Sequence, residues 1–325
     1  MTERPPTDAR AHLIARGLLE PAQDVEVTPL AGGVSGEVVA VRGDSVQLVV
    51  KTPLDRLKVA HDWRADRRRV VAEAEALRIA SRLTPDVVPR VVDLDGNAYV
   101  IVLEAAEPGW MSLRDQLMVG TCDTWVAARL GSALARWHKA TRRPELLPHE
   151  LRDLEAFVAL RIDPFYRFVA AQYPELGDTI DAAADALLAE RTCLVHGDLS
   201  PKNILVGPKR IWVLDWEVAH LGCPVFDLSF MLTHLVLKSV HRPQSAAGYS
   251  RFARAFVDAY RQGVGPAFPP EQQLVLNLGC LLLARVDGKS PAPYLTDDDA
   301  SRTRSLAIDV LTEKPATALD LWETL

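Results

Sequence analysis

The sequence has few cysteines and lacks an apolar run long enough to cross a membrane. Four cysteines are scattered along the chain: Cys122, Cys193, Cys223 and Cys280. They form neither a CxxC pair nor a Cys/His cluster, which argues against structural zinc. The apolar stretch at 274–284 is well short of a bilayer span, and the polar first ten residues lack a signal-peptide core. These absences predict a reduced, cytoplasmic protein with no membrane partner.

An excess of basic residues is also missing. The net charge of −6 and the pI near 5.8 argue against a nucleic-acid partner, because phosphate contacts normally need a basic surface. One short basic run is expected to be a solvated helix face. It contains Arg64, Arg67, Arg68 and Arg69.

The length and the periodicity predict a fold of two parts. The chain has 325 residues, of which 48% are hydrophobic and 25% charged, as in folded proteins of about two domains. A helix is expected at 9–19, then strands at 25–30, 37–41 and 46–51, a helix at 62–83, and strands at 91–94 and 99–103. Helices then dominate, at 113–117, 124–140, 150–157, 179–190, 225–240, 250–261, 271–285 and 298–311.

This order predicts an α+β, bilobed protein-kinase-like fold. The N-lobe, with a small antiparallel sheet and one inserted helix, is assigned to residues 1–103. A hinge is assigned to 104–109 and a larger, mainly helical C-lobe to 110–325.

The most specific pattern is HGDLSPKN at 196–203, followed by an apolar strand at 211–214. Asp198 is followed five residues later by Asn203, as in a kinase catalytic loop, where the Asp accepts the substrate hydroxyl proton and the Asn reaches a magnesium ion. Asp215 stands where the second metal-binding Asp belongs, and Glu217 is a further candidate ligand. Magnesium favours such oxygen donors, so the pattern predicts a phosphoryl-transfer site. His196 is expected to brace the loop through backbone hydrogen bonds.

The first part of the chain predicts a nucleotide site. Residues 31–38 fit the kinase glycine loop G-x-G-x-x-G-x-V with only its first glycine replaced, which makes Gly33, Ser35 and Gly36 candidate phosphate contacts. Fifteen residues after Gly36, a strand ends in Lys51, a candidate for holding the α- and β-phosphates of ATP. Its expected carboxylate partner is Glu73, with Glu75 as the alternative. Adenine is expected to bind backbone groups of Leu103 and Ala105.

With these residues in view, the chain resembles the aminoglycoside phosphotransferase, choline kinase and methylthioribose kinase superfamily over about residues 25–290. Within it the pattern is most similar to methylthioribose kinase, with Trp63 ten residues before Glu73 and Asp215-x-Glu217 in place of a DFG-type motif. The resemblance implies ATP and Mg²⁺ as cofactors and phosphorylation of a sugar hydroxyl. A substrate-binding arginine pair of that family corresponds to Ala284-Arg285 here. Trp63 and Arg285 are therefore candidate substrate contacts, with a packed Trp and a surface Arg as the alternatives.

Several alternatives stay open at this point. The acceptor is a small-molecule hydroxyl compound, either a sugar or an aminoglycoside. Carboxylates at 297–299 could face a polycationic drug, although an acidic helix N-terminus explains them as well. A protein kinase is disfavoured because the chain lacks an APE motif and a long activation segment, and the competing class is a non-catalytic nucleotide-binding pseudokinase. The choice between ATP and GTP, and between monomer and homodimer, is not determined.

Overall fold

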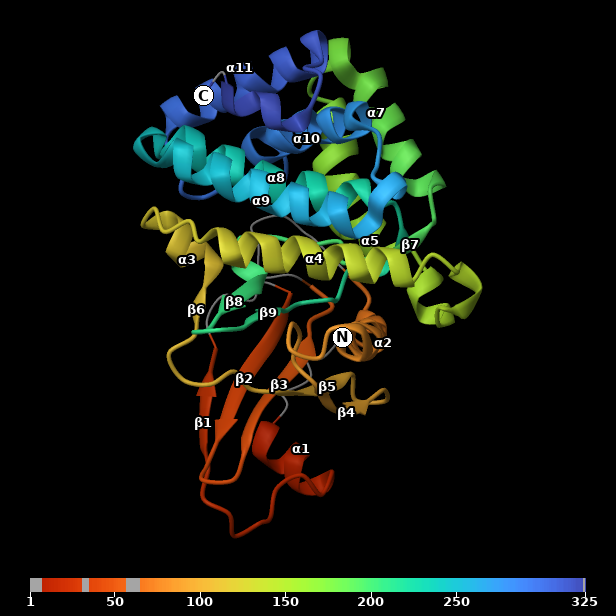
Figure 1. Cartoon of the computed structure of the whole chain (residues 1–325). Helices are drawn as coiled ribbons and strands as arrows, with labels where there is room; N and C mark the ends of the chain where they lie inside the picture. Colours follow the sequence, from red (N-terminus) through yellow and green to blue (C-terminus); the bar gives the residue numbers. More distant parts are fainter. Residues whose placement is uncertain (1–7, 31–34, 57–64, 324) are drawn as a thin grey trace.

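A β-sheet and a body of helices make up the fold, and they lie at opposite ends of the molecule (Figure 1). The computed structural model describes residues 8–30, 35–56, 65–323 and 325. The α+β, protein-kinase-like class predicted from the sequence is confirmed. No helix in those ranges is both long and apolar enough to cross a membrane.

The sheet has the strand order β1-β2-β3-β5-β4, and each neighbouring pair is antiparallel. Its strands are β1 (Glu26–Pro29), β2 (Gly36–Arg42), β3 (Gln47–Pro53), β4 (Val91–Asp95) and β5 (Val100–Glu104). Helix α1 (Ala9–Ala15) packs its buried Leu13 with Val41, Val50 and Val102 of the sheet in a small core. Successive side chains of a strand point to opposite faces of the sheet, and these three valines of β2, β3 and β5 lie on the same face.

Helix α2 (Arg69–Leu83) begins later than the sequence suggested. The expected start at 62 lies outside the described residues, and residues 65–68 are not helical. The carboxylate of Asp66 accepts hydrogen bonds from the backbone and side chain of Arg68, which holds a turn in place of a first helical turn. The expected solvated arginine face is wrong for Arg69, which is buried.

Short strands connect the sheet with the helices. They are β6 (Met111–Ser112), β7 (Cys193–Val195), β8 (Ile204–Val206), β9 (Ile211–Val213) and β10 (His220–Gly222). Strand β8 pairs with β6 and β9, and β7 pairs with β10. These pairings fix the loop at 196–203 and the residues after β9, where the predicted catalytic groups lie.

The larger core lies among the helices. The α-helices are α3 (Leu113–Met118), α4 (Thr124–Ala140), α5 (Glu155–Phe157), α6 (Phe168–Ala170), α7 (Pro174–Ala189), α8 (Val225–His241), α9 (Ala246–Val264), α10 (Glu271–Asp287) and α11 (Asp297–Glu313). Short 3₁₀ turns occur at Pro144–Leu146, His149–Arg152, Pro201–Asn203, Pro243–Ser245, Gly265–Ala267 and Ala318–Glu323. Helix α8 is buried from Val225 through Val240, so it is the central helix of this part.

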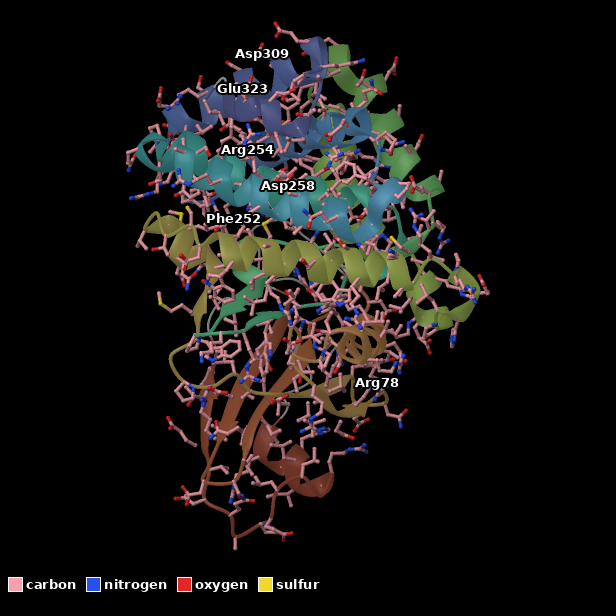
Figure 2. All side chains as sticks on the ribbon, in the orientation of Figure 1. Arg78, Phe252, Arg254, Asp258, Asp309 and Glu323 are labelled. Atoms are coloured by element: carbon pink, nitrogen blue, oxygen red, sulfur yellow. The ribbon has the colours of Figure 1, made fainter. Side chains whose placement is uncertain are left out.

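Helices α4 and α9 lie in close contact along their length (Figure 1). A side chain at Gly131 would place its Cβ 2.2 Å from the carbonyl oxygen of Phe256, so only glycine permits this approach. On α9, Phe252 is buried, whereas Arg254 and Asp258 are exposed, as expected for an amphipathic helix; all three are labelled in Figure 2.

The helix expected at 150–157 is wrong. The segment forms the 3₁₀ turn His149–Arg152, then α5, and continues as a π-helix over Val158–Arg167 with Pro164 inside it. An Asp-Pro pair such as Asp163-Pro164 favours the end of an α-helix, because proline has no N–H group to donate to the preceding turn. The wider π turn accommodates the proline, and such turns recur at functional sites.

Candidate functional site

The loop that carries Asp198 is held by a network of buried polar groups. The carboxylate of Asp227, on α8, accepts hydrogen bonds from the backbone N–H groups of His196 (2.8 Å) and Gly197 (2.9 Å). The Nε2 atom of His196 lies 3.0 Å from the carbonyl of Leu214, and its Nδ1 accepts from the N–H of Asp198. Burial lowers the pKa of His196, so the imidazole is neutral and braces the loop as the sequence predicts.

A glycine is required at position 197. Its φ is +76°, in the left-handed region, and a Cβ there would lie 2.6 Å from the carbonyl oxygen of Val218. The turn directs the next residue, Asp198, away from β7 and toward the residues that follow β9. The sharp turn therefore positions the predicted catalytic carboxylate.

Asp198 is buried and surrounded by donors. Its Oδ1 lies 2.8 Å from Nη2 of Arg161, and its Oδ2 lies 3.1 Å from Nζ of Lys202 and accepts from Nδ2 of Asn203 at 2.8 Å. Burial alone would raise the pKa of this carboxyl group, but the charges of Arg161 and Lys202 outweigh it and lower the pKa. Asp198 is therefore an ionised carboxylate with a fixed orientation and is a weak base.

The structure brings Asn203 and Asp215 together. The backbone N–H of Leu214 donates to the carbonyl of Asn203 at 2.8 Å, which joins the loop to the end of β9. Asp215 has a φ of 65°, an uncommon conformation for a non-glycine residue. Because Nδ2 of Asn203 donates to Asp198, its Oδ1 remains available as an oxygen ligand. This amide and carboxylate pair fits the oxygen-donor preference of Mg²⁺.

Lys51 connects the sheet to this pair of residues. Its ammonium group lies 2.9 Å from Oε2 of Glu73 and also contacts Oδ1 of Asp215. Burial would lower the pKa of Lys51, but the neighbouring carboxylates, above all Asp215, raise it, so the side chain stays charged. Burial likewise would raise the pKa of Asp215, and Lys51 lowers it instead. The alternative partner, Glu75, forms a surface pair with Arg78.

Glu217 lies next to the same cluster. Its Oε2 is 3.0 Å from Nε of Arg69 and 3.9 Å from Nζ of Lys51. The Arg69 guanidinium also donates to the carbonyls of Ser35, Leu54, Ala65 and Asp66. The assignment of Glu217 as a metal ligand stays a prediction, since Arg69 holds its carboxylate in this arrangement.

The predicted nucleotide loop is described only in part. Gly33 lies outside the described residues, whereas Ser35 is buried and Gly36 begins β2. A Cβ at Gly36 would lie 3.0 Å from the carbonyl oxygen of Thr52, so the two strands approach closely here. Leu103 lies in β5, opposite Val49 of β3. The N–H of Ala105 donates to the carbonyl of Gln47, so an adenine contact at Ala105 is restricted to its carbonyl.

The two predicted substrate contacts differ in outcome. Trp63 lies outside the described residues. Arg285, at the end of α10, is not the surface arginine offered as the alternative, because its guanidinium lies over the Phe165 ring at 5.9 Å and burial lowers its pKa. Its Nη1 donates to the backbone and hydroxyl oxygens of Ser290.

Three residues at the site were not predicted from the sequence. Arg161 comes from the irregular π-helix, Asp227 from the buried α8, and Arg69 from the basic run. The only signal available was charge: Asp227 stands in an otherwise apolar segment, and Arg161 stands between apolar residues. A charged residue in such a context is expected to have a buried partner.

Comparison with known proteins agrees with this geometry. A sequence model described as "Phosphotransferase enzyme family" matches residues 26–270. The methylthioribose kinase of Bacillus cereus (strain AH820) is 26% identical over 304 residues, covering 79% of this chain and 77% of that protein.

Solved structures support the fold. A choline/ethanolamine kinase family protein from Mesorhizobium loti aligns with a TM-score of 0.56 and 21% identity, covering 98% of both chains. An amicoumacin kinase in complex with AMP-PNP, Ca²⁺ and Ami aligns with a TM-score of 0.60 and 16% identity, covering 98% of this chain and 97% of that one. Because the sequence match extends over most of the chain and includes every element that positions the Asp198 cluster, the protein belongs to the phosphotransferase enzyme family.

Proposed function

We propose that this protein is an ATP- and Mg²⁺-dependent kinase that transfers the γ-phosphate to a hydroxyl group of a small molecule. One observation carries the proposal: a buried, ionised Asp198 lies close to Asp215, which pairs with Lys51 of the sheet. The assignment of residues 1–103 to nucleotide binding, 104–109 to a hinge and 110–325 to catalysis and acceptor binding is part of this proposal.

The chain's own residues have distinct roles in the proposed reaction. Asp198 accepts a hydrogen bond from the acceptor hydroxyl and aims its oxygen at the γ-phosphorus. A bond forms between them as the bond from the γ-phosphorus to its bridging oxygen breaks, ADP leaves, and the hydroxyl proton passes to Asp198. A carboxylate with a lowered pKa is a weak base, which suits a loose transition state in which the proton leaves late. Lys51, oriented by Glu73, neutralises phosphate charge.

The oxygens of Asn203 and Asp215 would hold Mg²⁺, with Glu217 as a further ligand. When bound, the ion supplies neutralisation of the β- and γ-phosphate charge. Within the described residues, no cluster of three His, Cys, Asp or Glu side chains is arranged to hold a metal. The proposed set differs from such a cluster because it includes an amide oxygen.

The test is Asp198→Asn, measured by coupled ADP release with a panel of sugars and aminoglycosides. We expect kcat to fall by about 10²–10⁴-fold, because the substitution removes the proton acceptor. Nucleotide affinity, measured by calorimetry with Mg²⁺ and AMP-PNP, should be largely retained. Asp185→Asn, at an exposed position on α7, is the matched control. Nucleotide binding without turnover of any acceptor by the wild-type protein, and no effect of Asp198→Asn, would support a non-catalytic pseudokinase instead.

A further inference from the structure

A row of side chains, two of them basic, follows one face of α8 away from the Asp198 loop. Phe230, His234 and Lys238 are spaced by four residues, which places them on the same side of the helix. The Phe230 ring lies 5.7 Å from the Arg161 guanidinium, which contacts Asp198, and 5.1 Å from the His234 ring. From Phe230 to Lys238 the face extends for roughly 12 Å, at 1.5 Å per residue. The row therefore begins near the predicted reaction centre and ends within the helical part.

Lys238 is a buried lysine without an acidic partner among the described residues. Its residue is 1% exposed, its ammonium group lies 5.1 Å from the centre of the Tyr294 ring, and its one hydrogen bond is a long one, 3.5 Å, to the carbonyl of His234. Among the described residues, no carboxylate lies within ion-pair distance of Lys238. Burying an ammonium group in this way is unfavourable for the folded protein alone.

Arg285, half-buried near the end of α10, is a second basic residue without an acidic partner among the described residues. Its guanidinium shares the Phe165 ring with Arg161, at 5.9 Å and 5.6 Å from the ring centre. It too has no carboxylate within ion-pair distance in the described part of the chain, and its Nε has no hydrogen-bond partner there. The buried hydroxyl of Tyr294, under Lys238, likewise lacks a partner. Hydrogen-bond donors without acceptors therefore gather on one side of Asp198.

Four cations act on a single imidazole in this region. Burial lowers the pKa of His234, and the charges of Lys238, Arg285, Lys202 and Arg161 lower it further. The nearby acidic groups are already engaged: Asp198 holds Arg161 and Lys202, and Asp299 lies 2.8 Å from Nδ1 of His241 and caps α11 through Thr296. Arg285, and Lys238 when it is protonated, therefore carry positive charge that no carboxylate in the described residues compensates.

We infer that the acceptor carries an anionic group, a carboxylate or a phosphate ester, which binds Lys238 and Arg285 while its hydroxyl group lies at Asp198. This inference rests on the proposed kinase function and names the acceptor class. An anion would supply the missing partners of the two cations and accept hydrogen bonds from Arg285 Nε and Tyr294. A polycationic aminoglycoside would be repelled by the same charges.

The test uses related sugar compounds that carry no charge, a negative charge or a positive charge. Binding of glucose, gluconate, glucose 6-phosphate and glucosamine to the ADP-saturated protein is measured by calorimetry, so that ADP occupies the nucleotide side and turnover is not needed. We expect gluconate or glucose 6-phosphate to bind at least about 10-fold more tightly than glucose, and glucosamine more weakly, because a charge-assisted pair contributes about 1.5–3 kcal/mol. The two anionic compounds distinguish a carboxylate from a phosphate site.

Two variants locate the charge. Lys238→Met and Arg285→Met should each reduce the preference for the anion by about 10-fold, whereas the exposed Lys209→Met should retain it. Two variants are used so that a folding defect in one, visible in its thermal melt, leaves the other informative. Equal binding of glucose and its anionic derivatives, or a preference for glucosamine, would overturn the inference even if the protein is a kinase. Failure to bind ADP would instead contradict the proposed function.

Discussion

The regions on the two sides of Asp198 differ in whether their buried charged side chains have a partner of opposite charge. On the side where we propose that the nucleotide binds, each buried ion has an opposite partner, with Lys51 between Glu73 and Asp215, and Arg69 on Glu217. On the side where we propose that the acceptor binds, Lys238 and Arg285 have no acidic partner in the described residues. Paired charges make a preorganised site that serves any ATP-dependent reaction, whereas unpaired charges select the molecule that neutralises them. Under the proposed function, phosphoryl transfer and substrate choice would therefore depend on different regions of the protein.

The largest effect is expected from removing the lysine of the paired side. Lys51→Met should lower kcat/KM for ATP by about 10²–10³-fold, because a preorganised positive group at the phosphates is lost and Glu73 is left buried without a partner. Steady-state kinetics with varied ATP would show it, and Lys139→Met on the exposed face of α4 is the control. A purely structural Lys51 would lower the melting temperature but leave kcat/KM of the folded fraction unchanged.

The buried Arg69–Glu217 pair should show strong coupling in a double-mutant cycle. Arg69→Met is expected to lower the free energy of unfolding by about 3 kcal/mol, because it leaves the Glu217 carboxylate without its nearest partner. Adding Glu217→Gln should restore part of this loss, as measured by urea unfolding. The surface pair Arg78 and Glu75 on the same helix is the control, expected to change stability by less than about 1 kcal/mol; Figure 2 labels Arg78. Additive effects at both pairs would contradict the comparison.

Arg161 joins the two sides, and its removal should affect the reaction step. Arg161→Met is expected to lower kcat by about 10–100-fold with little change in the KM for ATP, since the Asp198 carboxylate loses the ion pair with Arg161 that fixes it. Arg167→Met, on the exposed part of the same π-helix, is the control. Arg161→Lys should recover part of kcat. An unchanged kcat would show that Asp198 is oriented by Lys202 and Asn203 alone.

The smallest effect is expected in the pH dependence of folding stability that Lys238 causes. Burial, together with the charges of Arg285 and Arg114, lowers the pKa of Lys238 from 10.5 to about 7 in the folded protein. His234, Tyr294, His241 and Asp299 also lie in its surroundings. Between pH 7 and 10.5 the unfolded chain binds a proton that the folded protein does not, so this group makes stability rise with pH in that window.

Lys238→Met tests this sign directly. The variant should melt a few degrees higher than the wild type near pH 7, and the difference should shrink as the pH approaches 10, because the unfolded chain then nears its own pKa of 10.5 and folding costs less free energy for the release of the Lys238 proton. Differential scanning calorimetry across this range, without anions, would measure it. A variant that melts lower than the wild type at every pH would mean that Lys238 has a stabilising partner.

The sequence predicted the parts of the site that lie in short, fixed spacings. Asp198 and Asn203 share one loop, and Asp215 follows a short strand, so local geometry alone brings them together. Glu73 was predictable because Lys51 needed a carboxylate from the helix that follows. The fold class followed from strand and helix periodicity, although three-residue strands such as β7 and β10 are too short to show any.

The remaining residues depend on contacts between distant segments. Arg161 and Asp227 reach the loop from 36 and 31 positions away, along irregular or fully buried helices for which no pattern specifies a partner. Arg69 belongs to a run of arginines, and such a run of charge predicts a solvent-exposed helix face. The unpaired state of Lys238 is likewise a property of the packed helices, because a sequence shows that a lysine is present but not what lies around it.

The guanidinium of Arg69 joins four carbonyl groups near the sheet to a carboxylate beyond β9. Any movement that draws α2 away from the end of β9 must break the bond to Glu217. Such a movement would release Glu217 for a cation at the same moment as it loosened Ser35 next to the predicted phosphate loop. Arrival of a metal–nucleotide complex and rearrangement of this one side chain would then be a single event.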